Sequence, residues 1–324
     1  MELTISQGQY PINGSFTISR GSKTSVETVI VTLQKQGVVG RGECVPYPRY
    51  DESVDSVSAQ IQSISSEINA GIDRQTLQSL LPSGAARNAI DNALWDLECK
   101  LARTSIWHKL DLSAKPLQTA FTISLAEPSK MEQDARDNAF RPLLKLKLGG
   151  ADDLQRVAAV RRGAPNADII VDANEAWSVE LYQQLVPHLV ELGVSMIEQP
   201  FPAGEDHILA DLPRPITICA DESCHDRHSL DQIASCYDMI NIKIDKTGGL
   251  TEALLLKRQA QDLGLKVMVG CMLSSSLSMA PAFVLAQDAD IVDLDGPLLL
   301  AQDIDNGFDF TDNLMLPFSS KLWG

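Results

Sequence analysis

The stretch Asp168–Pro200, DIIVDANEAWSVELYQQLVPHLVELGVSMIEQP, holds the pattern on which the fold prediction rests. A β-branched run over 168–172 is followed by a helical pattern over 181–192, and a second apolar run over 196–198 follows the helix. A strand, a helix and a strand of these lengths are typical of one βαβ unit. The stretch therefore predicts two parallel strands, each ending in an acidic residue.

The same alternation continues on both sides of this stretch, from about residue 117 onward. Runs typical of strands return roughly every 20 to 27 residues, at 119–124, 143–148, 168–172, 196–198, 216–220, 239–244, 266–270 and 291–293. Eight strands that alternate with helices favour a parallel (β/α) barrel over an open doubly wound sheet. No G-x-G-x-x-G motif follows the first run, which weakens the alternative of a dinucleotide-binding domain. We therefore predict an α/β chain in which residues 116–300 form a TIM-type barrel.

The chain before the barrel shows no such alternation. A β-branched run at 27–34 and a second run after a glycine turn predict a hairpin. Helical spacing follows over 51–71 and again after Ser83, which can cap a longer helix. We expect residues 1–115 to form an α+β capping domain and the aromatic segment 301–324 to pack back on it.

Composition is that of an ordinary globular protein. The 324 residues are 44% apolar and 22% charged, and the net charge is −16. This charge argues against nucleic acid or an anionic membrane surface as a partner, so we expect a small-molecule substrate. The sequence leaves open whether the chain forms a homo-oligomer.

Three features bear on the compartment. The six cysteines include no C-x-x-C pair and predict buried thiols in a reducing environment. The N-terminus has no secretory signal pattern. The uncharged run 267–287 is long enough to span a bilayer, but glycine, serine and proline interrupt it, which favours a buried strand, turn and helix. We therefore expect a cytoplasmic protein without a membrane segment.

Charged residues end six of the eight predicted strands. Because barrel active sites lie at the C-terminal ends of the strands, we expect these residues to converge. Three are single carboxylates on consecutive strands: Asp172, Glu198 and Asp221. Oxygen ligands without His or Cys favour Mg²⁺ or Mn²⁺ over zinc. Any one of them could instead cap a helix or pair with a lysine, but the three together predict a divalent metal site.

Lysines flank this predicted metal site. Lys145 and Lys147 lie two residues apart in one strand and so point to the same side. We expect the repulsion between the two ammonium groups to lower their pKa values, so that one lysine is partly neutral and able to act as a base. The alternative is that both lysines are solvated residues at the end of a strand. Lys243 comes from a strand across the barrel. Lysines on two sides of a cation suit the transfer of an α-proton through an enediolate, whose charge the cation offsets.

Five motifs, in order, carry a resemblance to a known family. They are Lys145-x-Lys147, Val171-Asp-Ala-Asn-Glu-Ala-Trp177, Glu198-Gln-Pro200, Ala220-Asp-Glu-Ser223 and Asn241-Ile-Lys-Ile-Asp-Lys-Thr-Gly-Gly249. The chain resembles the muconate-lactonising subgroup of the enolase superfamily and, within it, the dipeptide epimerases that act on L-Ala-D/L-Glu. The resemblance implies a modified (β/α)₇β barrel with an α+β capping domain. It also implies a Mg²⁺-dependent isomerase of peptidoglycan recycling.

The resemblance also implies roles for the strand-end residues. The three carboxylates would bind Mg²⁺, and Lys147 and Lys243 would be the two acid/base catalysts. Lys145 would tune Lys147 and lie near the substrate carboxylate. We expect Asn174 and Asp245 to stand beside these groups and support them.

Further residues are expected to bind the substrate. The Asp293-Leu-Asp295 motif at the eighth strand resembles the feature that distinguishes dipeptide epimerases, and it suits a free α-ammonium, although it could also be a turn or capping motif. Lys23 stands in an early loop where similar enzymes carry an arginine for the side-chain carboxylate of the second residue. A lysine keeps the charge but lacks the bidentate fork. Thr122 on the first strand is expected to line the pocket.

Two other interpretations stay open. An o-succinylbenzoate synthase, an N-acylamino-acid racemase or a cycloisomerase would share the first half-reaction, but its substrate has no ammonium for Asp293 and Asp295 to hold. A barrel kept only as a binding or scaffold protein would have no use for two lysines and three carboxylates at one rim. The sequence therefore favours a dipeptide epimerase.

Overall fold

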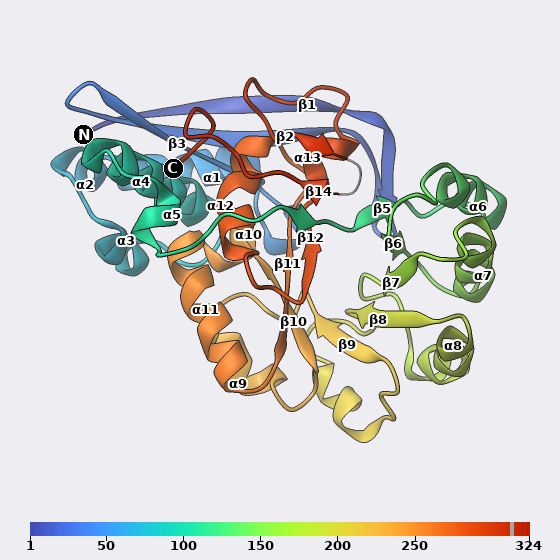
Figure 1. The fold of residues 1–324 in the computed structure, drawn as a ribbon. Coiled ribbons are helices and arrows are strands. Elements are labelled where there is room, and N and C mark those ends of the chain that lie inside the picture. Colours follow the sequence, from blue (N-terminus) through green and yellow to red (C-terminus); the bar gives the residue numbers. More distant parts are fainter. Residues whose placement is uncertain (312–313) are drawn as a thin grey trace.

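The computed structural model describes residues 1–311 and 314–324, and it confirms the predicted barrel-type α/β fold (Figure 1). Eight parallel strands form one sheet in chain order. They are β5 (Phe121–Ile123), β6 (Leu143–Lys147), β7 (Asp168–Asp172), β8 (Val194–Glu198), β9 (Thr217–Ala220), β10 (Met239–Lys243), β11 (Lys266–Gly270) and β12 (Ile291–Asp293). The last strand returns to the first, because the backbone N–H of Ala120 donates to the carbonyl of Val292 at 2.8 Å.

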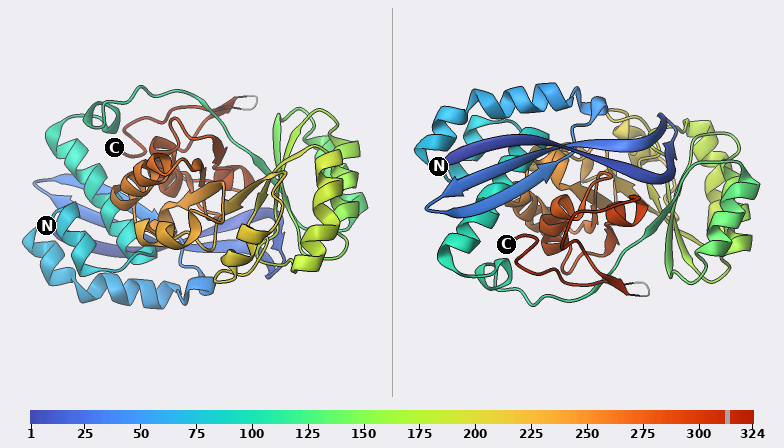
Figure 2. Two further views of the ribbon diagram at one scale, coloured as in Figure 1. Left: turned by 90° about the horizontal axis from the view of Figure 1, so that it is seen from below. Right: turned by 90° about the horizontal axis from the view of Figure 1, so that it is seen from above.

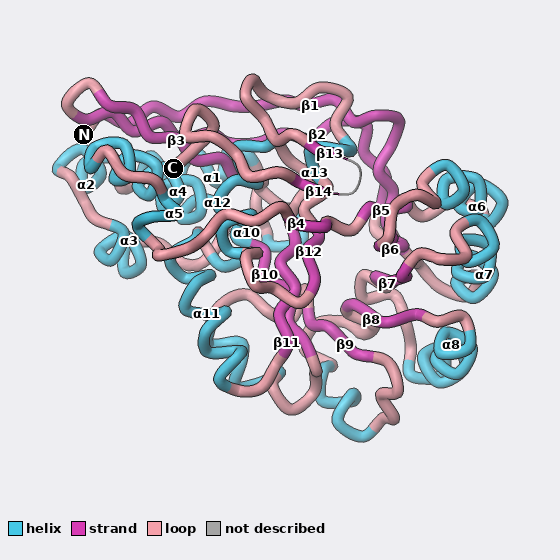
Figure 3. Tube along the Cα trace, viewed as in Figure 1, coloured by secondary structure: helices cyan, strands magenta, loops and turns pink. Residues whose placement is uncertain are grey.

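Helices connect the strands around the outside of the barrel (Figure 3). The longer ones are α6 (Pro128–Asp137), α7 (Asp153–Gly163), α8 (Val179–Glu191), α11 (Leu250–Asp262) and α12 (Ser276–Leu285). After β8 and β9 the connections hold only short elements, namely η2 (Asp206–Asp211), η3 (Arg227–Ser229) and α9 (Leu230–Ile233). Short helices α10 (Ile244–Thr247) and α13 (Gly296–Leu299) directly follow β10 and β12. The order is that of a (β/α)₇β barrel with two shortened crossovers.

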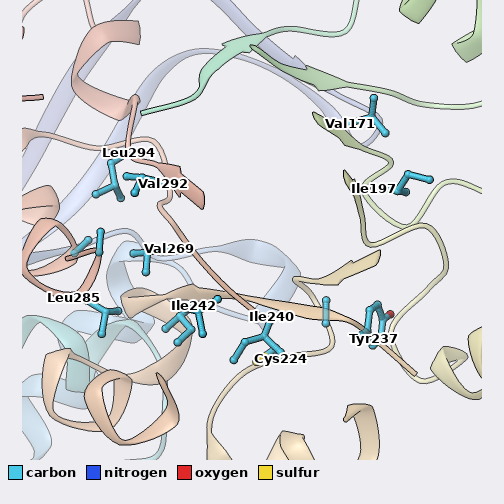
Figure 4. Packing of buried hydrophobic residues seen from close by; sticks show 14 of the residues in the cluster. Val171, Ile197, Cys224, Tyr237, Ile240, Ile242, Val269, Leu285, Val292 and Leu294 are labelled. Atoms are coloured by element: carbon cyan, nitrogen blue, oxygen red, sulfur yellow. The ribbon is translucent and has the colours of Figure 1, made fainter. Parts of the chain in front are cut away.

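The strands are apolar on both faces because the sheet is buried on both sides. Side chains such as Val171, Ile197 and Ile240 face the helices and belong to the main core (Figure 4). A separate cluster points inward and closes the lower part of the barrel: Ala120, Leu143, Ile170, Met196, Cys219, Met239, Met268 and Ile291. This apolar plug packs beneath the residues at the C-terminal ends of the strands and supports them.

The N-terminal part of the chain folds as a three-stranded antiparallel sheet with helices packed on it. The strands are β1 (Glu2–Ile18), β2 (Gly21–Lys35) and β3 (Val38–Cys44). The helices are α1 (Val54–Ser63), α2 (Ser65–Ala70), α3 (Arg74–Leu80), α4 (Ala85–Ala102) and α5 (Ile106–Lys109), with a 3₁₀ turn, η1 (Pro48–Tyr50), before them. Helix α4 lies so close to β3 that a Cβ on Gly42 would stand 2.2 Å from the carbonyl oxygen of Ala89. Figure 2 shows the β1–β2 hairpin running across the barrel.

One of two local predictions in this part is confirmed and the other is wrong. The region 51–71 is helical as predicted, but as two helices, because the backbone at Ile64 leaves the helical conformation at φ −111° and ψ 20°. Ser83 does not cap α4, whose N-cap is Gly84 without a side-chain cap bond. The Ser83 hydroxyl donates to Asp226 at 2.6 Å instead, and the carboxylate of Glu52 accepts from the Ala85 N–H at 2.8 Å.

The C-terminal segment lies against α4 and β1. The indole N–H of Trp323 donates to the Asn92 carbonyl at 3.0 Å, and Leu300 bridges Ile12 of β1. A small sheet joins β4 (Leu117–Gln118), β13 (Phe310–Thr311) and β14 (Leu314–Met315). All six cysteines are free thiols. Within the described ranges, no helix combines the length and apolar character needed to cross a membrane.

Candidate active site

The floor of the site follows from the alternation of side chains along the strands. Residues two positions beyond the apolar plug point in the same direction, into the barrel. On or directly after the eight strands these are Thr122, Lys145, Asp172, Glu198, Asp221, Asn241, Gly270 and Asp293. Polar and charged side chains therefore form a layer directly above the plug, at the C-terminal rim.

Three carboxylates of this layer come together as one cluster. One oxygen each from Asp172, Glu198 and Asp221 lies within 4.8 Å of the other two, and all three residues are buried. Burial would ordinarily favour the neutral acid, but Lys147 and Lys145 lower the pKa of Asp172. Three buried carboxylate oxygens in reach of one point, in a cluster that includes no His or Cys of the described residues, fit a hard divalent cation such as Mg²⁺ or Mn²⁺.

Neighbouring side chains fix each carboxylate. The amide of Asn241 donates to Oε1 of Glu198 at 2.7 Å. The side chain of Asn241 fits because residue 270 on the adjacent strand β11 is a glycine, where a Cβ would stand 2.6 Å from the Asn241 Oδ1. Asp221 lies between two ammonium groups, with Lys243 Nζ 2.6 Å from Oδ2 and Lys246 Nζ 2.6 Å from Oδ1. These lysines outweigh burial and hold the pKa of Asp221 well below its usual range.

The two predicted base lysines lie on opposite sides of the carboxylate cluster. Lys147 ends β6 and Lys243 ends β10, with three strands between them along the barrel. Lys147 Nζ is 2.5 Å from Oδ2 of Asp172. Both lysines line a cavity of about 470 Å³ between the rim and the capping unit. A substrate carbon in this cavity would lie between the two amines.

The expectation that Lys145 and Lys147 depress each other's pKa is wrong for Lys145. Its Nζ lies 2.6 Å from Glu198 and 2.7 Å from Asp293, and 3.6 Å from Asp172. Burial opposes the ammonium form, but these carboxylates outweigh it and raise the pKa of Lys145 well above its usual range. Sequence spacing alone could not show how many acidic groups face this lysine.

Asp293 and Asp295 line a smaller cavity next to the first, together with Thr122 and Lys147. Oδ2 of Asp295 accepts from the backbone N–H of Thr122 at 2.6 Å. Oδ1 of Asp293 is buried and has no hydrogen-bond partner among the residues that the structure describes. Burial, and then the neighbouring Asp293, raise the pKa of Asp295 to about 6. The pair presents an unsatisfied acceptor and negative charge, which suits a cationic ligand group.

The β1–β2 hairpin supplies part of the cavity wall. Lys23 lines the cavity, with its Nζ 5.4 Å from the centre of the Tyr47 ring. Arg20 holds the hairpin to the rim through ion pairs of 2.8 Å to Glu222 and 3.2 Å to Glu175. Arg49 pairs with the same Glu175 at 2.8 Å. Sequence analysis assigned no role to Arg20, because a surface arginine shows no partner until the hairpin is placed.

The two predicted supporting residues lie on different sides of the site. The backbone N–H of Asn174 donates to Oδ1 of Asp172 at 2.9 Å, and Asn174 lines the cavity. Asp245 faces the capping unit, where its Oδ1 accepts from the Val45 N–H at 2.9 Å and from Asn88 at 2.8 Å. Asn241 and Lys246 were not singled out from the sequence. Strand alternation would have found Asn241, but only the fold places Lys246 against Asp221.

Family models cover most of the chain. The N-terminal domain model of mandelate racemase / muconate lactonizing enzyme matches residues 1–110, and the enolase C-terminal domain-like model matches residues 130–310. The L-Ala-D/L-Glu epimerase of Escherichia coli K12 is 43% identical over 93% of this chain and 95% of its own length. The N-acetyl-D-glutamate racemase of a Pseudoalteromonas species is 41% identical over 91% of this chain and 95% of its own length.

The fold is also similar to that of a solved structure. An enolase family member from Agrobacterium tumefaciens, described as homologous to dipeptide epimerases, holds sodium and L-Ala-L-Glu. It superposes with a TM-score of 0.98 at 49% identity and covers 99% of both chains. With matching models for both parts and relatives above 40% identity along nearly its full length, the chain belongs to the mandelate racemase/muconate lactonizing enzyme branch of the enolase superfamily.

Proposed function

We propose that the protein is a divalent-metal-dependent dipeptide epimerase that inverts the α-carbon of the second residue of L-Ala-D/L-Glu. The observation that carries this proposal is the placement of Lys147 and Lys243 on opposite sides of a cluster of three buried carboxylates. Both lysines line one cavity, and Asp221 of the cluster lines it as well. The similarity to L-Ala-D/L-Glu epimerase supports the choice of substrate.

Asp172, Glu198 and Asp221 would hold Mg²⁺, and Mn²⁺ suits the same oxygen ligands. A bound dication would offset the negative charge that builds up on the substrate carboxylate when the α-proton leaves. Lys145, which already contacts two of these residues, adds positive charge at the same place.

The two lysines would carry the proton transfer. One takes the α-proton from its face of the carbon, and the other returns a proton to the opposite face, which inverts the centre. The first lysine must be neutral and the second charged, so the two work in opposite protonation states. For the other stereoisomer their roles exchange.

Asp293 and Asp295 would hold the free α-ammonium of the N-terminal residue. The unpartnered Oδ1 of Asp293 gains a hydrogen-bond donor, and the charge of the buried pair is offset. Lys23, on the cavity wall, would attract the side-chain carboxylate of an acidic second residue. L-Ala-D-Glu is a fragment of peptidoglycan, so we place the enzyme in peptidoglycan recycling in the cytoplasm.

An N-acylglutamate racemase is the second candidate, favoured by the 41% identical N-acetyl-D-glutamate racemase. Its substrate has the same glutamate α-carbon but a neutral amide in place of the ammonium. Such a group would bring no positive charge to the buried Asp293 and Asp295, whose pairing with Lys145 leaves Oδ1 of Asp293 unused among the described residues. This counts against the second candidate.

The two candidates are separated by measuring the turnover of L-Ala-L-Glu and of N-acetyl-L-glutamate in the presence of Mg²⁺. Chiral chromatography of the products gives the rates. We expect kcat/KM for the dipeptide to exceed that for the N-acetyl compound by at least about a hundredfold. The Asp293→Asn variant should lose most of this preference. Faster turnover of N-acetyl-L-glutamate, or a preference that Asp293→Asn leaves unchanged, would contradict the proposal.

A further inference from the structure

Resting on the metal site of the proposed function, we infer that Gln199 is the positioning residue that sets the spacing of the three carboxylate ligands. Gln199 directly follows Glu198 at the end of β8, and its side chain is fully buried. It does not line the cavity, and within the described part of the chain its side chain bonds to no carboxylate oxygen. It acts through the backbone of the two neighbouring strand ends.

The side-chain amide of Gln199 holds the loop that follows β9. Its Oε1 accepts from the backbone N–H of Asp221 at 2.9 Å and of Ser223 at 3.2 Å. This fixes the main chain at Asp221 itself, so the ligand from β9 cannot move independently of the ligand from β8. A backbone contact of this kind constrains the direction of the side chain it carries.

The backbone of Gln199 extends the same connection to a third strand. Its N–H donates to the Cys219 carbonyl on β9, and its carbonyl accepts from the Glu175 N–H in the loop after β7, both at 2.9 Å. Gln199 thus contacts the segments that follow Asp172 and precede Asp221. One residue therefore links the three strand ends that supply Asp172, Glu198 and Asp221.

The amide nitrogen anchors Gln199 itself. Nε2 lies 2.9 Å from the Phe201 carbonyl, 2.9 Å from the Ser223 hydroxyl and 3.0 Å from the Tyr237 hydroxyl. The Tyr237 hydroxyl in turn donates to Asp206 at 2.6 Å. Tyr237 is one of the buried side chains of the main core (Figure 4).

Only glutamine meets all of these demands. The position needs an acceptor for two N–H groups and a donor for a carbonyl, at the reach of a three-carbon side chain. A glutamate would keep the acceptor but lose the donors and place a carboxylate against the Phe201 carbonyl. The backbone of Gln199 also has a φ of 36°, a left-handed conformation that these bonds hold in place.

The test is the affinity for Mn²⁺, measured by titration calorimetry without substrate, in the wild type, Gln199→Met and Gln199→Glu. The methionine removes every side-chain bond at similar size, and we expect its Kd for Mn²⁺ to rise about 10- to 100-fold. The glutamate keeps the oxygen that faces Asp221, so its Kd should rise less. Melting temperatures of the metal-free proteins are recorded alongside.

Gln287 is the matched control for loss of a buried glutamine. It is buried beyond α12, where its amide accepts from the Lys115 N–H at 3.1 Å, away from the strand ends that carry the carboxylates. Gln287→Leu should lower the melting temperature and leave the Kd for Mn²⁺ within about twofold of the wild type.

Three outcomes would overturn the inference. The first is a Kd for Mn²⁺ in Gln199→Met that equals that of the wild type, and the second is weaker Mn²⁺ binding by Gln199→Glu than by a folded Gln199→Met. The third is a loss of Mn²⁺ affinity in Gln287→Leu as large as that in Gln199→Met. Should Gln199→Met not fold, a wild-type Kd in Gln199→Glu overturns it equally. Failure of the wild type to bind Mn²⁺ would remove the metal site and this inference together. Normal Mn²⁺ binding without epimerase activity would contradict only the proposed function.

Discussion

Asp295 is the residue whose ionisation we expect to control substrate binding. Its pKa of about 6 reflects burial first and the charge of Asp293 second, while Lys145 and the Thr122 N–H act against the shift. The guanidinium of Arg141 also interacts electrostatically with Asp295. A carboxylate with a raised pKa is protonated below that pKa and then attracts an ammonium less strongly.

We therefore predict that kcat/KM for L-Ala-L-Glu falls as the pH is lowered through about 6, because kcat/KM reports ionisations of the free enzyme. Asp295→Asn should have a lower kcat/KM that no longer changes in this pH range. Initial rates between pH 5 and 8 measure both profiles. If kcat/KM of Asp295→Asn still falls at low pH as in the wild type, the ionisation belongs to another group.

At the residue scale, the sequence predicts those side chains whose place follows from strand alternation. Asp172, Glu198 and Lys147 stand at the ends of recognisable strands, and period two fixes the side to which they point. Gln199 and Lys246 could not be found this way. Their partners lie on neighbouring strands and loops, so their roles depend on contacts that only the folded chain makes.

The β1–β2 hairpin is the element that closes the cavity, and Arg20 is its attachment to the rim. Glu222 is almost fully buried, and loss of Arg20 would leave that carboxylate without its ion pair. We predict that Arg20→Gln raises KM for L-Ala-L-Glu about tenfold, with a smaller change in kcat, because the hairpin closes less firmly over the substrate. Steady-state kinetics of the wild type and the variant measures KM and kcat separately.

The same variant should be cleaved faster by trypsin after Lys23, because a released hairpin exposes its backbone. Arg162→Gln is the matched control, since it removes an exposed ion pair with Glu132 far from the hairpin. Equal cleavage rates in the wild type and Arg20→Gln would mean that the ion pairs do not hold the hairpin.

At the element scale, the barrel strands were predictable and the capping unit was only partly so. The eight barrel strands repeat one pattern, and each observed strand overlaps its predicted run. The break at Ile64 leaves no mark in the apolar spacing, because α1 and α2 bury the same side of the chain. Ser83 has a capping side chain, but Asp226 from the barrel competes for it.

Helix α4 joins the capping unit to the barrel across the whole molecule. One side packs against β3, and the other contacts the segment after β10. Asn88 donates to Asp245 at 2.8 Å, and the Thr251 N–H donates to Asp91 at 2.9 Å. Most residues of α4 are buried between the two parts. Because α4 contributes Trp95 and Cys99 to the barrel core and its other buried apolar residues to the capping core, we expect the two parts to unfold together.

We therefore predict a single thermal unfolding transition by scanning calorimetry, with equal calorimetric and van't Hoff enthalpies. Asn88→Leu removes one of the two hydrogen-bond donors to Oδ1 of the buried Asp245. It should therefore lower the melting temperature by roughly 2–5 °C while the transition stays single. Ser79→Ala, on the exposed side of α3, should have no such effect. Two resolved transitions would show that the parts unfold independently.

The two-lysine mechanism is tested most directly by deuterium exchange at the glutamate α-carbon, followed by ¹H NMR in D₂O with Mg²⁺. The wild type should exchange this proton in both L-Ala-L-Glu and L-Ala-D-Glu and interconvert them. Lys147→Ala and Lys243→Ala should each abolish interconversion, yet each should retain exchange with one stereoisomer, a different one for each variant. Retention of exchange with the same stereoisomer by both variants, or wild-type interconversion by either, would contradict the assignment of one lysine to each face.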